Sequence, residues 1–210
     1  MADPVLDAIT ASRIVAIVRL EQYDHAVEVA RALLAGGITA VEFTLTGSGA
    51  NEAISATRSV LGDHMQVGVG TVLDPAAASA AISAGAQFVV TPALRPAVIE
   101  ACLAHAVPIL CGALTPTEAL TAHEAGADMI KIFPARSFGP SYIRDLLAPL
   151  PFLRVVPTGG ISADNAHSYL AAGAAAVGIG GNLVAARAVV HRDWAAISAA
   201  ARACVDAIAA

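Results

Sequence analysis

The chain contains a single lysine, Lys131, within the apolar segment MIKIFP at positions 129–134. Arginine supplies the other eleven basic residues, so a position that keeps lysine indicates a need for an amine rather than for charge alone. Burial of an ammonium group in an apolar strand is costly and favours the neutral amine, which can form a Schiff base with a ketone. The alternative is a lysine that pairs with a buried carboxylate or extends outwards to solvent.

A second ionisable residue, Glu42, interrupts another apolar run, AVEFTL at 40–45. A buried carboxylate needs a partner or takes up a proton, and either condition suits a group that transfers protons during Schiff-base chemistry. An ion pair with Arg19, which ends a neighbouring apolar run, is the structural alternative, and both roles can hold at once.

Two glycine-rich segments follow apolar runs near the end of the chain. Thr158 is followed by Gly159 and Gly160, and the sequence GIGGN includes Gly180 and Gly181. Glycines allow backbone N–H groups to approach a phosphate closely, so these segments are candidate phosphate-binding loops. The alternative is a pair of tight turns that bind no ligand.

Composition excludes several other classes of function. The formal net charge is −5, from 12 basic and 17 acidic residues, which argues against a nucleic-acid partner. The six histidines are scattered without a metal-ligand spacing, so we expect no metal site. The N-terminus lacks a secretory pattern, no run is typical of a membrane span, and the three cysteines have no close pair. We therefore expect a cytoplasmic protein.

The candidate residues lie in or after short apolar runs that recur at intervals of 20 to 27 residues. Each run precedes a longer alanine-rich segment with helical spacing, which indicates parallel strands covered by helices. The eight expected strands are Ile14–Leu20, Ala40–Leu45, Val67–Val72, Phe88–Pro92, Pro108–Leu114, Met129–Pro134, Val155–Thr158 and Ala176–Gly180. This pattern predicts an α/β fold, a single (β/α)8 TIM barrel over residues 1–210 with a short N-terminal helix. An open doubly wound sheet is the competing architecture.

Local signals mark several helix ends. Asp74 before Pro75 is typical of a helix start, and Ser162 is a candidate cap for a later helix. Ala-Gly followed by a small residue recurs upstream of four expected strands, and we expect each glycine to end a helix in a left-handed conformation. The four copies are Ala35–Gly37, Ala84–Ala86, Ala125–Ala127 and Ala172–Ala174.

Between about Ile14 and Val184 the chain resembles a known enzyme family. The segments VEFTL, GVGTV, FVVTPAL, IKIFPA, FGPSYI and VPTGGIS occur in that order. They are similar to those of the 2-keto-3-deoxy-6-phosphogluconate (KDPG) / 4-hydroxy-2-oxoglutarate aldolases. The resemblance implies a lyase on a (β/α)8 barrel that cleaves a small 2-keto acid to pyruvate and an aldehyde. It also implies a homotrimer that needs no metal or organic cofactor.

The resemblance assigns roles to individual residues. Lys131 would form the Schiff base, and Glu42 would be the general acid and base, acting through a water molecule. The substrate-binding residues would be Thr71 at the pyruvate carboxylate, Pro92 and Phe133 along the pocket, and Thr158 at a substrate hydroxyl. The phosphate of the aldehyde half would lie on Gly159, Gly160, Gly180 and Gly181.

The chain departs from the family pattern at Thr46, where many relatives carry an arginine that holds the anionic groups of the substrate, and at Asn182, where many have serine. Either Arg19 supplies the charge or the preferred substrate differs. A 6-phosphogalactonate aldolase remains an alternative, as do a phosphosugar isomerase or epimerase on the same barrel and a non-catalytic barrel that binds a phosphorylated keto acid.

Overall fold

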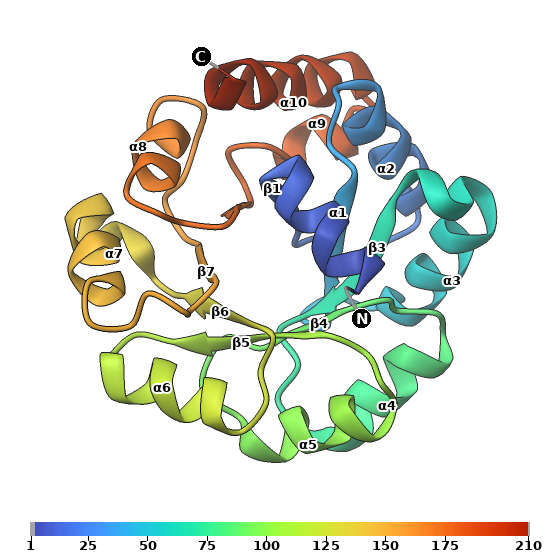
Figure 1. Ribbon diagram of the computed structural model, residues 1–210. Helices are drawn as coiled ribbons and strands as arrows, with labels where there is room; N and C mark the ends of the chain where they lie inside the picture. The colour runs from blue at the N-terminus through green and yellow to red at the C-terminus, as the bar shows by residue number, and fades with distance from the viewer. Residues whose placement is uncertain (1–2, 210) are drawn as a thin grey trace.

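The computed structural model describes residues 3–209, which form eight parallel strands that alternate with helices (Figure 1). The strands are β1 (Ile14–Val18), β2 (Ala40–Thr44), β3 (Gln66–Gly70), β4 (Val89–Val90), β5 (Ile109–Ala113), β6 (Met129–Ile132), β7 (Val155–Pro157) and β8 (Val177–Ile179). Their order in the sheet is β7-β6-β5-β4-β3-β2-β1-β8. The predicted (β/α)8 barrel is therefore confirmed, and each strand lies within one residue of an expected run or inside it.

The sheet closes between its last two strands. Thr158 and Gly178 form a parallel bridge just beyond β7, and the Ala175 N–H donates to the Val155 carbonyl at 2.9 Å. This closure makes the segments after β7 and β8 neighbours in space. Both glycine-rich segments therefore lie at the same part of the barrel mouth.

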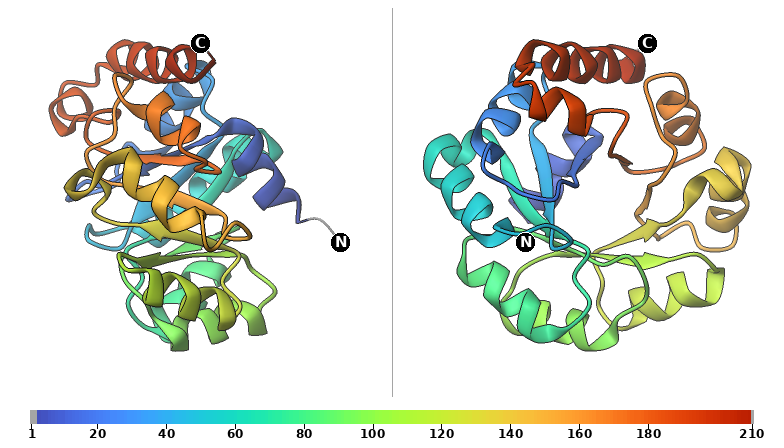
Figure 2. Two further views of the ribbon diagram at one scale, coloured as in Figure 1. Left: turned by 60° about the vertical axis from the view of Figure 1, so that its left-hand side comes forward. Right: turned by 180° about the vertical axis from the view of Figure 1, so that it is seen from behind.

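The helices surround the barrel as a ring, except for the first, which lies across one end of the barrel (Figure 1), and Figure 2 shows them from two further directions. They are α1 (Pro4–Ser12), α2 (Ala26–Ala35), α3 (Ala50–Leu61), α4 (Pro75–Ser83), α5 (Pro96–Ala104), α6 (Pro116–Glu124), α7 (Gly139–Leu147), α8 (Ala166–Ala171), α9 (Ala186–Val190) and α10 (Trp194–Ala209), with 3-10 turns η1 (Gly62–His64) and η2 (Ala135–Ser137). Within the described residues, no helix has the length and apolarity needed to cross a membrane.

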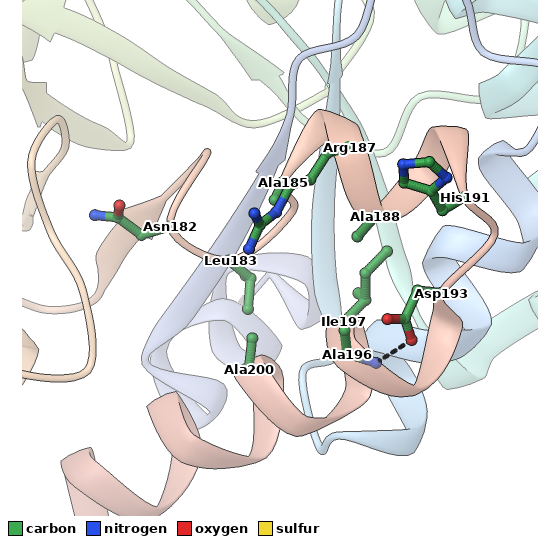
Figure 3. A pocket seen from close by; sticks show the side chains of 10 residues that line it. All are labelled: Asn182, Leu183, Ala185, Arg187, Ala188, His191, Asp193, Ala196, Ile197 and Ala200. Carbon is green, nitrogen blue, oxygen red and sulfur yellow. Dashed lines mark hydrogen bonds between the residues drawn. The ribbon is translucent and has the colours of Figure 1, made fainter.

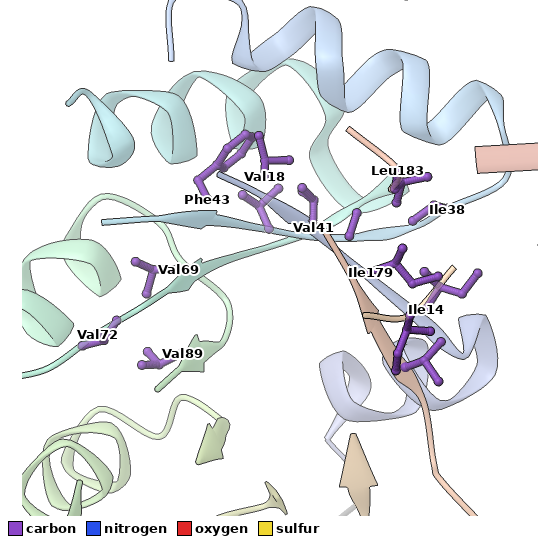
Figure 4. Close-up of a cluster of buried hydrophobic side chains, with 14 of the residues drawn as sticks. Ile14, Val18, Ile38, Val41, Phe43, Val69, Val72, Val89, Ile179 and Leu183 are labelled. Atoms are coloured by element: carbon purple, nitrogen blue, oxygen red, sulfur yellow. The ribbon is translucent and has the colours of Figure 1, made fainter. Parts of the chain in front are cut away.

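Strand side chains alternate between the outer and the inner face of the barrel. Outward residues such as Val41, Phe43 and Val69 pack beneath the helices in the larger apolar core, part of which is drawn in Figure 4. A smaller cluster fills the barrel interior towards the end where the strands begin. Its members are Leu6, Ile9, Val15, Ala40, Phe88, Val90, Leu110, Met129, Val156 and Ala176.

Helix α1 closes the end of the barrel where the strands begin. Leu6 and Ile9 are buried in the inner cluster, and Asp3 caps the helix by accepting from the Val5 N–H at 2.8 Å. Arg154, in the segment before β7, donates to the Leu6 carbonyl at 3.3 Å and also to Thr10. Because this end is filled with apolar side chains, polar chemistry is confined to the opposite end of the strands.

Of the two helix starts predicted from local signals, one is confirmed and one is wrong. The Asp74 side chain accepts from the Ala77 N–H at 2.9 Å, so the predicted start of α4 is confirmed. Ser162 caps no helix, because α8 begins at Ala166 and the Ser162 hydroxyl instead bonds Asp164 at 3.2 Å within the preceding turn.

The predicted left-handed glycines are confirmed in three of the four copies. Gly85, Gly126 and Gly173 have φ of 104°, 100° and 105°. In the first copy the left-handed residue is Gly37 (φ 95°), one position later than expected, because Gly36 still has a helical conformation at the end of α2.

Candidate active site

Lys131 lies on β6 with its side chain inside the barrel. Ile130 and Ile132 point outwards into the helix-covered core, so the strand pleat turns Lys131 inwards. In register it lies between Gly112 on β5 and Val156 on β7, and it is 5 % exposed. The solvent-facing alternative for this lysine is therefore wrong.

Glu42 reaches the same point from β2, across the barrel interior. It is 2 % exposed, and its Oε1 atom lies 3.5 Å from the Nζ atom of Lys131. Charge-assisted hydrogen bonds are usually shorter, about 2.7–2.9 Å. Oε1 is buried without a hydrogen-bond partner, so the two groups face each other without being clamped together. The alternative pairing of Glu42 with Arg19 is wrong, since the carboxylate pairs with Lys131.

A cavity of about 10 Å³ adjoins the two side chains, and this is close to the volume needed to hold one water molecule. Its lining comes from strands all around the barrel. The lining residues are Val15, Ile17, Glu42, Val90, Leu110, Lys131, Val156, Thr158 and Gly178. The amine and the acid thus share an enclosed, largely apolar space.

Glycines on β3 and β8 make room for Glu42 and for Thr158, and the sequence alone did not identify these contacts. A Cβ atom at Gly70 would lie 2.5 Å from Oε1 of Glu42, and one at Gly178 would lie 2.3 Å from Oγ1 of Thr158. Neither distance is sterically possible. A glycine inside a strand is a general signal of such a close approach, but it does not name the partner.

The remaining pocket residues proposed from the sequence surround the pair. Phe133 follows Lys131 along the chain, and its ring centroid lies 5.7 Å from Nζ, within cation–π range. Pro92 packs over Gly112, where a Cβ atom would lie 2.3 Å from the carbonyl carbon of Pro92. Thr158 lines the cavity itself.

Thr71 has an unusual backbone conformation. It follows Gly70 at the end of β3 and has φ of 60°, in the left-handed region that β-branched residues rarely adopt. Such strain costs on the order of 1–3 kcal/mol and concentrates at functional sites. Thr71 thus directly follows Gly70, the glycine whose Cβ position meets Glu42, and its role in the site stays a prediction.

Arg19 lies outside the cavity, in an open groove of about 820 Å³ that Thr46 also lines. Thr46 does not project freely there, because its hydroxyl bonds that of Thr44 at 2.8 Å. Thr44 in turn bonds the buried hydroxyl of Tyr23 at 3.1 Å. This network connects the ends of β1 and β2, and the positive charge that lines the groove comes from Arg19 and Arg192.

The two glycine-rich segments lie together beside the mouth of the barrel. The Asn182 side chain donates to the Ile161 carbonyl at 2.9 Å and thereby connects the segment after β8 to the one after β7. Gly159 and Gly160 have φ of 95° and 80°. Among the hydrogen bonds of residues 3–209, none uses the N–H of Gly159, Gly160 or Gly181, so these donors are free for a ligand.

A separate pocket of about 360 Å³ lies between the segment after β8, α9 and the start of α10 (Figure 3). Arg187, His191 and Asp193 are among its lining residues, and Asp193 caps α10 by accepting from the Ala196 N–H at 3.0 Å. Neither in this pocket nor at any other place within residues 3–209 is a group of three His, Cys, Asp or Glu side chains arranged to hold a metal ion.

The family model of the KDPG and KHG aldolases matches residues 5–200 of this chain. The chain belongs to this aldolase family. It is 38 % identical over 196 residues to a 2-dehydro-3-deoxy-phosphogluconate aldolase of Treponema pallidum, covering 93 % of both chains. It is 37 % identical over 180 residues to a 2-dehydro-3-deoxy-6-phosphogalactonate aldolase of Escherichia coli K12, covering 85 % of this chain and 88 % of the relative.

Solved structures of aldolases have the same fold. A KDPG aldolase from Legionella pneumophila, with pyruvate captured as a covalent carbinolamine intermediate, superposes with a TM-score of 0.89 at 27 % identity. The match covers 96 % of this chain and 98 % of that one. The predicted family and its assignment to the lyases are therefore confirmed.

Proposed function

We propose that this chain is a class I, Schiff-base aldolase that cleaves KDPG, or a related 2-keto-4-hydroxy acid such as 4-hydroxy-2-oxoglutarate, to pyruvate and an aldehyde. The observation that carries the proposal is the buried pair of Lys131 and Glu42, with Nζ and Oε1 3.5 Å apart inside the barrel. An amine nucleophile and a carboxylate that transfers protons are the two groups this chemistry needs.

The reaction begins with attack of the Lys131 amine on the keto carbon of the substrate. A carbon–nitrogen bond forms, and the carbonyl oxygen takes up a proton to give a carbinolamine. Loss of that hydroxyl as water gives an iminium ion. Glu42 is the group placed to accept the proton that the amine releases and to donate one to the departing hydroxyl, directly or through a water molecule.

Carbon–carbon cleavage uses the iminium as an electron sink. The C4 hydroxyl loses its proton, the C3–C4 bond breaks, and its electron pair moves towards nitrogen to leave an enamine. The C4 fragment departs as the aldehyde. Protonation of the enamine at C3 and addition of water then release pyruvate and the free amine of Lys131.

We assign the binding of the substrate to the residues around this pair. Thr71 contacts the pyruvate carboxylate, a role supported by its strained backbone beside Gly70. Pro92 and Phe133 form the walls of the pocket, and Thr158 contacts a substrate hydroxyl from the cavity wall. Arg19 attracts the anionic substrate at the adjoining groove.

We assign the phosphate of the aldehyde half to Gly159, Gly160, Gly180 and Gly181. The free N–H groups of Gly159, Gly160 and Gly181 support this assignment, since unpaired backbone donors at a glycine-rich loop bind anions. The closeness of the two loops at the barrel closure supports it as well.

Borohydride reduction in the presence of pyruvate tests the proposal. We expect one covalent adduct, located on Lys131 by mass spectrometry. The assignment is simple because the chain has no other lysine. Lys131→Arg keeps the positive charge but removes the nucleophilic amine, so we expect it to abolish both the adduct and turnover.

The same variant separates this proposal from an isomerase or epimerase, in which Lys131 would act only through its charge. Retention of activity by Lys131→Arg, or turnover by the wild type without any trapped adduct, would overturn the Schiff-base mechanism. A trapped adduct without release of pyruvate from any 2-keto acid would instead support a barrel that only binds its ligand.

A 2-keto-3-deoxy-6-phosphogalactonate aldolase is the second candidate, favoured by the 37 % identity to the relative of that name. The two sugar acids differ in configuration at C4, so both share the chemistry of Lys131 and Glu42. Comparison of kcat/KM for the two substrates and for 4-hydroxy-2-oxoglutarate decides between them.

We further propose a homotrimer that acts in the cytoplasm. An oligomer is supported by a related chain, 35 % identical with a TM-score of 0.87, found in a protein cage designed by fusing symmetric oligomeric domains. The cytoplasm is supported by Cys102, Cys111 and Cys204, which are buried and form no disulfide.

A further inference from the structure

Arg136 lies beside the proposed phosphate loop because the pairing of β6 and β7 continues past both strands. The Ala135 N–H donates to the Thr158 carbonyl at 2.8 Å, and the Arg136 N–H donates to the Gly159 carbonyl at 3.0 Å. These two hydrogen bonds hold η2 against the start of the glycine segment. Arg136 is thus only five residues from Lys131 and next to the loop that we assign to the phosphate.

The side chain of Arg136 lies on Gly160. A Cβ atom at Gly160 would lie 2.6 Å from Cβ, 3.3 Å from Cδ and 3.4 Å from Cγ of Arg136. The aliphatic part of the arginine therefore covers the face of Gly160 that any other residue would occupy. The stem that carries the guanidinium group therefore starts on Gly160, in the glycine segment whose N–H groups make no hydrogen bond within residues 3–209.

The guanidinium group of Arg136 is not used by the fold. Three arginines have structural partners: Arg58 donates to the Gly62 carbonyl, Arg154 to the Leu6 carbonyl and Arg202 to the Ala35 carbonyl. Arg136 is one of the eight other arginines, and it is the one whose stem packs on the glycine segment. Arg136 is exposed and, within residues 3–209, its side chain makes no hydrogen bond or ion pair. It therefore remains available to an anion from solution.

We infer that Arg136 binds the phosphate of the substrate and makes the enzyme selective for phosphorylated acids. The inference rests on the proposed function and adds a cation to its phosphate site. A planar guanidinium pairs with phosphate through two parallel hydrogen bonds, and backbone N–H groups complete the cradle. Thr46, which follows β2, carries no charge. Arg136, which follows β6 on the opposite side of the barrel mouth, supplies a positive charge instead.

Steady-state kinetics of Arg136→Gln test this inference, with KDPG compared to the same acid without its phosphate. We expect KM for KDPG to rise about 10- to 100-fold, the range for loss of a hydrogen bond to a charged group. We expect kcat for KDPG and both constants for the unphosphorylated acid to stay within about threefold. Inorganic phosphate should inhibit the wild type competitively and the variant more weakly.

Two further variants act as controls. Arg144→Gln on α7 removes the same charge from an exposed position of the same βα unit and should change neither constant. Arg136→Lys keeps the charge without the planar fork and should recover part of the KM for KDPG. The inference is overturned if Arg136→Gln changes KM equally for both acids or changes neither. It is also overturned if the selective rise in KM for KDPG occurs in Arg19→Gln or Arg187→Gln and not in Arg136→Gln.

Failure of this inference is distinguishable from failure of the proposed function. Trapping of pyruvate on Lys131 by borohydride needs no phosphate, so it should be the same in the wild type and in Arg136→Gln. An unlabelled wild type refutes the Schiff-base mechanism. A labelled variant with unchanged KM for KDPG refutes only the role of Arg136.

Discussion

The contact between Gly70 and Glu42 gives a sharp test of how the site is held. In Gly70→Ala the new Cβ atom would lie 2.5 Å from Oε1 and 2.7 Å from Cδ of Glu42. An ordinary contact begins at 3.4 Å, so the carboxylate must move by about 0.9 Å. A misplacement of about 1 Å at a reacting group lowers rates on the order of 100-fold. We therefore expect kcat for pyruvate release to fall about 100-fold while the chain still folds.

Gly68 offers a matched control on the same strand. Gly68 and Gly70 both point into the barrel, and a Cβ atom at Gly68 would lie 2.5 Å from the ring of Phe88. The three atoms nearest to this position all belong to Phe88, so Gly68→Ala overpacks the inner cluster, and we expect it to destabilise the fold by about 1–3 kcal/mol. Urea denaturation measures that loss for both variants, and kcat is then compared at a temperature where both are folded.

A third variant distinguishes displacement of the carboxylate from general damage. Glu42→Asp shortens the side chain and withdraws the carboxylate from the position that the new methyl group needs. We expect this change to reduce kcat less in the Gly70→Ala background than in the wild type, which is a coupling between neighbours. The reasoning is refuted if Gly70→Ala turns over within about threefold of the wild type, or if Gly68→Ala loses as much kcat.

Two further predictions concern stability. Ile9→Ala removes a fully buried side chain of α1 from the barrel interior, so the free energy of unfolding in urea should fall by about 2–5 kcal/mol. The kcat of the folded variant should be unchanged, because α1 lies at the end of the barrel opposite to Lys131 and Glu42. A large loss of kcat would contradict this separation of the apolar end from the catalytic end. Burial, with Asp128 and Cys111 nearby, raises the pKa of the Cys102 thiol from 9.0 to about 12. The folded state therefore favours the protonated thiol, and the stability this gives is present below pH 9 and lost as pH rises from 9 to 12. Cys102→Ala should flatten that fall, as measured by denaturation at pH 8 and about pH 10.5, and an unchanged slope would contradict the assignment.

Sequence reasoning located the strands because each is an apolar run of the length a buried parallel strand needs. It also found Lys131, since a sole lysine in an apolar strand is conspicuous without any structure. The partner of Glu42 could not be found in this way. β2 and β6 are separated by three strands in the sheet, so the two side chains meet only because the barrel closes on itself.

Arg136 and Gly70 illustrate what the sequence could not supply. Arg136 is one of eleven arginines, and its importance follows from a contact with Gly160, 24 positions along the chain. Gly70 precedes Thr71 and ends a strand, which indicates a turn as readily as a close contact. In both cases the informative quantity is a distance between segments that are remote in sequence.

The two ends of the barrel interior explain why one small chain can hold an amine and an acid together. Towards the start of the strands, α1 and Phe88 fill the interior with apolar side chains, so water has no access from that side. Towards the other end, glycines at 70 and 178 leave the space that Glu42 and Thr158 occupy, and Lys131 lines the same cavity. In the proposed mechanism the substrate therefore arrives over Thr71, Phe133 and the glycine loops, with its keto carbon leading. An anionic group at the far end of the substrate is then left at the mouth, where Arg136 and the free backbone donors lie. The closed end thus supports the proposed direction of entry, in which the cleavable bond lies between the Lys131 amine and the proposed phosphate site.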